Sequence, residues 1–195
     1  MSFLETLINI DRDLFLTLNG WHHPVADWIM FYVSKMWVWI PIYLAVVYYI
    51  IRTWKKESIW IILSMILCVV LTDQLTNITK EVFQRPRPSH ALDLQGMVHH
   101  VQGYLGGKYG FVSGHSANVF GFALLSSLII KRKWFYFVAF SWAALVAYSR
   151  IYLGVHYPLD ILGGMVLGLS VAGLVYLTWH TIRKKLISEI KHRFF

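Results

Sequence analysis

Five long apolar segments constrain the fold of this chain more than any other feature of its sequence. They cover residues 36–52, 58–83, 113–130, 134–149 and 158–180. A helix that crosses a bilayer needs about 20 mostly apolar residues. The chain is 57% hydrophobic and only 14% charged, whereas soluble domains are nearer a quarter charged. We therefore predict an all-α, polytopic membrane helix bundle with about five transmembrane helices, the two at 113–130 and 134–149 being short.

The residues before the first span fit the membrane surface better than its core. Residues 3–18 carry Phe, Leu and Ile at helical spacing, but acidic and basic residues interrupt them, so no cleavable signal peptide is expected. This helix would either lie on the membrane surface or pack on the bundle as a cap. Residues 24–34 are too short to span. The predicted organisation is an amphipathic, interfacial segment at 1–35, a membrane core at 36–180 and a basic tail at 181–195.

Clusters of basic residues predict the orientation in the membrane. Arg52, Lys55 and Lys56 follow the first span, residues 131–133 join the third and fourth, and five more follow the fifth. Five spans put all three clusters on one side, which is then the cytoplasmic side of a cell (inner) membrane. The C-terminus would be cytoplasmic and the N-terminus external. The net charge of +8 is thus mainly a topology signal, and no nucleic-acid partner is expected.

The sequence offers little for binding a metal. The single cysteine, Cys68, lies within an apolar run, where it is expected to pack in the membrane core. The nine histidines include adjacent pairs such as His22–His23, and neighbours in sequence are poorly placed to chelate one ion from a regular helix. No HExxH motif is present. We therefore expect no metal site.

Polar residues at the external ends of the spans predict an anion-binding pocket. Asp73, Asn77 and Lys80 share one face of the second span, which should face the bundle interior because charges in lipid are costly. The prolines at 86 and 88 end that helix and place Arg85 and Arg87 at its mouth. Arg85 alone fits an interfacial cation whose charged end reaches water. Lys80 with Arg87 fits an anion site.

The third span adds a helix N-terminus to this end of the bundle. Ser113 and Gly114 immediately precede a long apolar run, so their N–H groups should point outward. Such unpaired donors, together with the helix dipole, favour a bound anion. His115 lies in the first turn of the same helix.

The stretch "SRIYLGVHYPLD" joins the fourth and fifth spans and holds three ionisable groups. Arg150 closes the fourth span, and Pro158 suits the first turn of the fifth. Asp160 follows His156 by four residues, close enough to accept a hydrogen bond from its ring. That bond would leave the other ring nitrogen free to attack. Such an imidazole beside several cations predicts a nucleophile aimed at a bound phosphate.

Three motifs in order resemble the type-2 phosphatidic acid phosphatase family, which is related to vanadium haloperoxidases and bacterial acid phosphatases. They are "KEVFQRPRP", "VSGH" and "SRIYLGVHYPLD", and the similarity covers about residues 36–179. Val112 stands where the family usually has proline, which supplies no catalytic group. Bacterial members often have six spans, whereas the sequence predicts five here, without the first.

The resemblance implies a metal-independent phosphatase without a cofactor. Its phosphate would be bound by Lys80, Arg87, Ser113, Gly114 and Arg150. His156 would attack phosphorus to form a phosphohistidine, and Asp160 would orient it. His115 would protonate the leaving oxygen and then help to activate water.

Substrate choice is open at this level. The expected substrate is a lipid whose phosphate reaches the external surface, with undecaprenyl pyrophosphate (undecaprenyl diphosphate) first. The alternatives are phosphatidylglycerol phosphate, phosphatidic acid and a lipid A phosphate, or a non-catalytic protein that only binds lipid phosphates. The 89–110 loop would shape the headgroup pocket through Lys108, His99 and His100. Gly164 and Gly168 predict close helix packing within the monomer, and the oligomeric state is open.

Overall fold

The computed structural model describes residues 2–194, with side chains described for residues 2–185. Its part of the chain is all-α and contains no β-strand, only one isolated bridge between Pro86 and Tyr109. The α-helices are α1 (Phe3–Gly20), α2 (Pro24–Val33), α3 (Ile40–Trp54), α4 (Ser58–Phe83), α5 (Gly114–Ile130), α6 (Lys133–Tyr152) and α7 (Pro158–Phe194). Short 3₁₀ helices are η1 (Met36–Trp39), η2 (Lys55–Glu57), η3 (Pro88–His90) and η4 (Leu92–Leu94).

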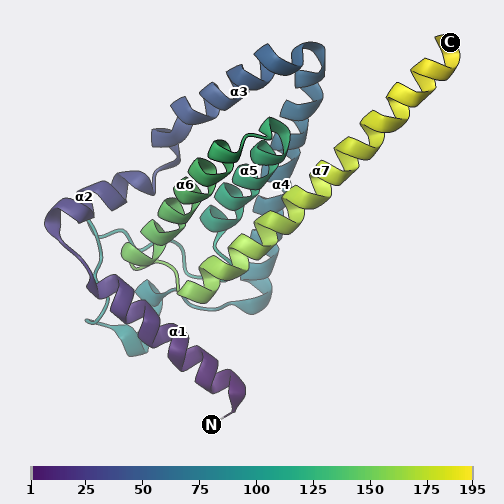
Figure 1. Ribbon diagram of the computed structural model, residues 1–195. Helices are drawn as coiled ribbons and strands as arrows, with labels where there is room; N and C mark the ends of the chain where they lie inside the picture. Colours follow the sequence, from purple (N-terminus) through teal and green to yellow (C-terminus); the bar gives the residue numbers. More distant parts are fainter. Residues whose placement is uncertain (1, 195) are drawn as a thin grey trace.

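The five predicted spans correspond to α3 to α7, which confirms the polytopic bundle. Three helical stretches are long and apolar enough to cross a membrane, at Met36–Phe83, Lys133–Tyr152 and Pro158–Lys185. The first of them contains both α3 and α4, joined by the turn of η2. With 17 residues, α5 is shorter. It packs against α4, α6 and α7 and buries most of its surface in protein, as expected for a helix whose ends do not face lipid (Figure 1).

Glycines bring α5 and α7 into direct backbone contact. A Cβ atom on Gly164 would clash with the carbonyl oxygen of Ser113, and one on Gly168 would clash with that of Ala117. These two glycines therefore serve packing within the monomer, as predicted. The contact also lets the N–H of Ser113 donate to the carbonyl of Asp160 at 2.9 Å. The start of α5 is thereby held against the start of α7.

Helix α1 packs on the bundle at its C-terminal half. Phe15 is completely buried and meets the Tyr157 ring edge-on, with 5.3 Å between centroids. The N-terminal half projects from the bundle (Figure 1), with Phe3, Leu4 and Ile8 exposed. Of the two arrangements that the sequence allows, the structure therefore shows a helix docked on the bundle by one half of its length.

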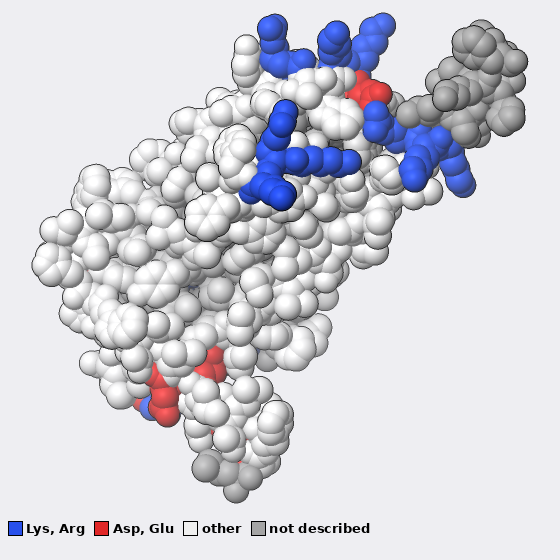
Figure 2. Space-filling model, viewed as in Figure 1, with Lys and Arg blue, Asp and Glu red and all other residues white. Residues whose placement is uncertain are grey.

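The basic clusters gather at one end of the molecule. Figure 2 shows Lys and Arg where α3 turns into α4, where α5 turns into α6, and along the last described side chains of α7. These include Arg52, Lys55 and Lys56, residues 131–133, and residues 183–185. The α1 helix and the start of α7 lie toward the opposite end (Figure 1). The rest of the basic tail lies outside the described side chains.

Candidate active site

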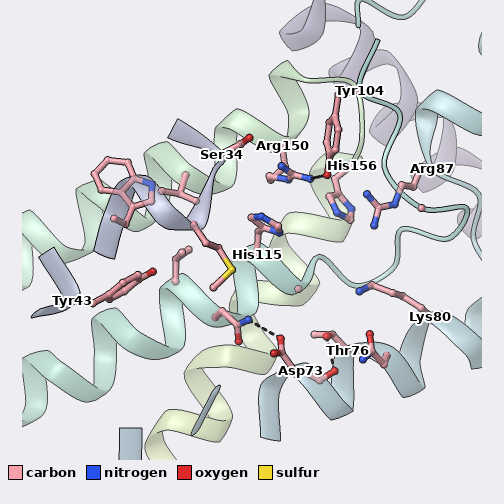
Figure 3. A pocket seen from close by; sticks show the side chains of 18 residues that line it. Ser34, Tyr43, Asp73, Thr76, Lys80, Arg87, Tyr104, His115, Arg150 and His156 are labelled. Atoms are coloured by element: carbon pink, nitrogen blue, oxygen red, sulfur yellow. Dashed lines mark hydrogen bonds between the residues drawn. The ribbon is translucent and has the colours of Figure 1, made fainter. Parts of the chain in front are cut away.

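A cavity of about 260 Å³ opens at the end of the bundle away from the basic clusters. It lies among the 34–39 segment, the start of α3, helices α4, α5 and α6, the long 84–113 connection and the connection from α6 to α7. Figure 3 shows charged and imidazole side chains from these elements turned toward the same space. The predicted site residues among its lining are Lys80, Arg87, Gly114, His115, Arg150 and His156.

Helix α4 contributes a polar face to this cavity, as its residue spacing predicts. Asp73, Asn77 and Lys80 all line the space. Asp73 lies two turns below Lys80, and its Oδ1 accepts a hydrogen bond from Asn118 Nδ2 on α5 at 2.7 Å. The Asn118 Oδ1 atom in turn accepts from the Thr72 hydroxyl. The lower wall of the cavity is therefore a hydrogen-bonded set of neutral and acidic groups, whereas the upper wall is cationic.

Arg87 is held over the cavity by the backbone of the 84–113 connection. Helix α4 ends at Phe83 and is followed by Gln84 in a left-handed conformation. Beyond it, the Arg87 N–H donates to the carbonyl of Lys108. The Arg87 Nε donates to the carbonyl of Tyr109 at 3.0 Å. Burial, reinforced by the positive charge of Arg150, lowers the pKa of Arg87 from its ordinary value. A guanidinium in this position would be stabilised by an anion.

The N-terminus of α5 also lies at the cavity, but Ser113 is turned away from it. The Ser113 hydroxyl is buried and caps the helix by accepting from the N–H of Ser116. Gly114 does line the cavity, and a Cβ there would lie 3.6 Å from Lys80 Nζ. The His115 imidazole lies within hydrogen-bonding reach of the Ser34 backbone. A phosphate contact by the Ser113 side chain stays a prediction.

Arg150 gives the strongest indication of an anion. It ends α6 with only 2% of its surface exposed, and its Nη2 donates to the Tyr104 hydroxyl at 3.1 Å. Among the residues with described side chains, its buried Nε has no hydrogen-bond partner and no carboxylate forms an ion pair with Arg150. A buried cation without a counter-charge is strongly unfavourable. Because Arg150 lines the cavity, a bound anion would supply the missing partner.

His156 lies opposite these cations and is paired with Asp160. The two are joined by a 3.3 Å contact from Nδ1 to Oδ2, and His156 is only 1% exposed. A proton on Nδ1 leaves the Nε2 lone pair free. Burial lowers the pKa of His156 well below its usual value, and the positive charges of Arg87, Arg150 and Lys80 lower it further. The imidazole is therefore neutral, as a nucleophile must be.

Sequence reasoning missed the contacts of three further residues, two beside this pair and one beside Arg150. Arg85 is not an isolated interfacial cation, which corrects the expectation for it. Its Nη1 donates to Asp160 at 2.9 Å and its Nη2 donates to Asp11 at 2.6 Å. Gly110 packs directly against the pair, and Tyr104 supports Arg150. The "RPRP" sequence could have marked Arg85, but nothing local pointed to Asp11, 74 residues away.

The loop residues expected to contact a headgroup lie outside the cavity lining. Lys108 is exposed, with its Nζ over the Tyr109 ring at 5.2 Å. His99 stacks on His22 and bonds Asp27 through Nε2 at 3.0 Å. The Nδ1 of His100 is buried without a partner, and burial lowers the pKa of His100. Within the described residues, no group of three or more His, Cys, Asp or Glu is arranged to hold a metal ion.

A membrane helix bundle with an oriented, neutral imidazole facing a cationic pocket is the arrangement of a membrane-embedded phosphatase. Comparison with known proteins agrees, since the PAP2 superfamily model matches residues 58–184. The chain belongs to the PAP2 superfamily, the type-2 phosphatidic acid phosphatases.

Individual relatives differ in the substrates that their names give. A lipid A 4'-phosphatase of Porphyromonas gingivalis is 41% identical over 175 residues, covering 89% of this chain and 74% of the relative. An undecaprenyl-diphosphatase of Sulfolobus acidocaldarius is 28% identical, covering 84% of this chain and 76% of the relative. The crystal structure of Aquifex aeolicus LpxE superposes with a TM-score of 0.67 at 26% identity, covering 84% of this chain and 92% of that one.

Proposed function

We propose that this phosphatase removes a phosphate group from a membrane lipid through a phosphohistidine intermediate. The observation that carries the proposal is the His156–Asp160 pair facing a cavity that Lys80, Arg87 and Arg150 line. The three cations and the Gly114 N–H would bind the phosphate oxygens. His156 Nε2 would attack phosphorus while the bond from phosphorus to the lipid oxygen breaks.

His115 would complete the two half-reactions. It donates a proton to the departing lipid oxygen, which leaves as a hydroxyl group. It then takes a proton from a water molecule that attacks the phosphohistidine, so that inorganic phosphate forms and His156 regains its lone pair. Phosphate-monoester hydrolysis requires accelerations approaching ~10²¹-fold. Preorganised charge would supply most of this, and acid catalysis about 10²–10⁴-fold.

For the substrate, we infer a phosphorylated saccharide lipid of the lipid A type in preference to undecaprenyl pyrophosphate. The relative with 41% identity bears the name lipid A 4'-phosphatase, whereas the undecaprenyl-diphosphatase has 28% identity. The lining of the cavity supports the same choice of substrate. Lys108, the residue expected to favour a second phosphate, is outside the cavity lining, and Asp73 would repel an additional negative charge. The Asp73–Asn118 wall suits hydroxyl or amide groups of a leaving group.

The location follows from the same arrangement. The basic clusters lie at the end of the bundle opposite the cavity. With those clusters on the cytoplasmic side, the active site of an inner-membrane protein would face the periplasm or exterior. Labelling of single cysteines by a membrane-impermeant reagent in intact cells tests this. Exclusive labelling at residue 55, on the basic side, would contradict it.

Phosphate release by the purified protein in detergent tests the function. The four substrates are lipid A, undecaprenyl pyrophosphate, phosphatidylglycerol phosphate and phosphatidic acid, with His156→Ala as the matched control. We expect the highest kcat/KM with lipid A, activity that persists in EDTA, and inhibition by vanadate. Higher efficiency with undecaprenyl pyrophosphate would overturn the substrate assignment. Equal inertness of wild type and His156→Ala on all four lipids would instead favour a protein that only binds lipid phosphates.

A further inference from the structure

Helix α1 carries two buried polar side chains on the face that packs on the bundle. Asp11 is 3% exposed and Asn19 is 1% exposed. They lie about two turns apart on the same face of the helix. Both form hydrogen bonds to the segment that contains His156, and neither lines the cavity.

Asn19 holds the segment just after Arg150. Its Nδ2 lies within hydrogen-bonding distance of the carbonyls of Ile151 at 3.2 Å and Tyr152 at 2.9 Å. Its Oδ1 accepts the N–H of His99 at 2.8 Å. The last carbonyls of a helix have no partner within the helix. Asn19 therefore fixes the end of α6, where Arg150 enters the cavity.

Asp11 holds the same segment just before Asp160. Its Oδ1 accepts the N–H of Leu159 at 2.8 Å, one of the donors that the start of α7 leaves free. Its Oδ2 accepts from Arg85 Nη2 at 2.6 Å. Helix α1 thus binds the His156 segment at both of its ends.

Arg85 carries the effect of Asp11 to the reacting pair. Its Nη2 donates to Asp11, and its Nη1 donates to Asp160 Oδ1. The other oxygen of Asp160, Oδ2, faces His156 Nδ1. A planar guanidinium between two carboxylates has little freedom to rotate. The side chain of Arg85 is 23% exposed, so without Asp11 it could turn toward water, and Asp160 Oδ1 would lose its hydrogen bond from Arg85.

We propose that Asp11 is a positioning residue for catalysis, acting through Arg85 on Asp160 and hence on the orientation of the His156 imidazole. The proposal rests on the proposed function of His156 as the nucleophile. It assigns α1, which reaches no reacting atom, a part in setting the turnover rate.

Substitution of Asp11 by asparagine tests this with the least change of shape. The amide oxygen can still accept from Leu159, whereas the charge that holds Arg85 is lost. We expect kcat to fall about tenfold with KM within about twofold, and Arg85→Gln to behave alike. Asp13→Asn, an exposed carboxylate on the same helix, is the matched control and should retain wild-type kinetics.

A double-mutant cycle separates positioning from general loss of structure. If Asp11 acts through Arg85, then Asp11→Asn should cost less than twofold in kcat when Arg85 is already Gln. Equal and additive losses, or a change in KM alone, would overturn the proposal. So would wild-type kcat in folded Asp11→Asn. If Asp11→Asn does not fold, Arg85→Gln alone tests the proposal. A raised KM with unchanged kcat in Arg85→Gln would show that Arg85 contributes to substrate binding and would overturn the positioning role.

Vanadate binding distinguishes this proposal from the proposed function. Vanadate resembles the transferring phosphoryl group, so its affinity should fall by about the same factor as kcat. Thermal stabilisation by vanadate measures that affinity without turnover. If wild type released no phosphate, the proposed function would fail. Weaker stabilisation of Asp11→Asn than of Asp13→Asn would then show that Asp11 shapes the anion site only, which would overturn its role in catalysis. Equal stabilisation of both variants would overturn it.

Discussion

His156 and Asp160 face each other across the first turn of α7, with 3.3 Å between Nδ1 and Oδ2. Oδ2 also accepts the N–H of Tyr157 at 3.0 Å, and Oδ1 accepts from Arg85. These three contacts together hold the Asp160 carboxylate in one orientation. If this carboxylate orients the His156 imidazole, changing it should lower the turnover rate.

Asp160→Asn tests that dependence. The amide can place its NH₂ toward His156, which would favour the wrong tautomer, with the proton on Nε2. We expect kcat to fall by about 10²–10⁴-fold, as for other histidines that lose an orienting carboxylate. Phosphate release under saturating substrate measures it. Asp13→Asn, which changes an exposed carboxylate on α1, is the control. A loss below fivefold would show that Asp160 does not orient the nucleophile.

Gly110→Ala tests the tight packing around the pair. A Cβ at this position would lie 2.8 Å from Asp160 Oδ2 and 3.2 Å from Arg87 Cγ. One of these groups must move, so we expect kcat/KM to fall about tenfold or more while the protein remains folded. Gly173→Ala, where nothing lies within 4 Å of the added methyl, should keep full activity. Wild-type kinetics in Gly110→Ala would contradict the described geometry.

The pH dependence should reflect the lowered pKa of His156, which burial and then the charges of Arg87, Arg150 and Lys80 produce. An ordinary histidine of pKa 6.5 would be about 90% protonated at pH 5.5 and would lose activity about tenfold. We expect the wild-type acid limb of kcat/KM to lie below pH 6.5. In Arg87→Gln the limb should move to higher pH, because one positive charge is gone. Ionisation of the substrate affects wild type and Arg87→Gln equally, so it does not contribute to the difference between them. Acid limbs at the same pH in both proteins would contradict the prediction.

The lowered pKa of His156 also determines how the stability of the protein changes with pH. The unfolded chain binds a proton at His156 as the pH falls through 6.5, whereas the folded protein does not. The contribution of His156 to the free energy of unfolding should therefore be fully present above pH 6.5 and decrease below it. In His156→Gln this part of the pH dependence should disappear, as measured by thermal unfolding in detergent.

Gly168→Ala tests the contact between α5 and α7. Its Cβ would clash with the backbone of Ala117, which cannot move without displacing α5. We expect destabilisation of about 1–3 kcal/mol or more, as for other overpacked cores, seen as a lower Tm in detergent. Gly173→Ala on the same helix should be neutral or slightly stabilising. An unchanged Tm in Gly168→Ala would show that the two helices can separate without cost.

The sequence by itself determined the helices and most of the pocket. The apolar segments predict the starts of α3 to α7 within a few residues, since a bilayer sets a minimum length for each span. The end of α7 was predicted wrongly, because the helix continues past residue 180 to Phe194. Lys80, Arg87, Arg150 and His156 were recognisable because charges at the ends of apolar helices need a local reason. The pairing of His156 with Asp160 follows from helical spacing, a local property.

Only the tertiary structure decided what depends on distant parts of the chain. The bonds that join Asp11 to Arg85 and Arg85 to Asp160 span 74 and 75 residues of sequence, and the first of them connects α1 to the 84–113 connection. Lys108 is near the site in sequence, yet the path of its loop places it outside the cavity lining. Periodicity describes which face of a helix is buried, but the partner of that face is set by packing the whole bundle.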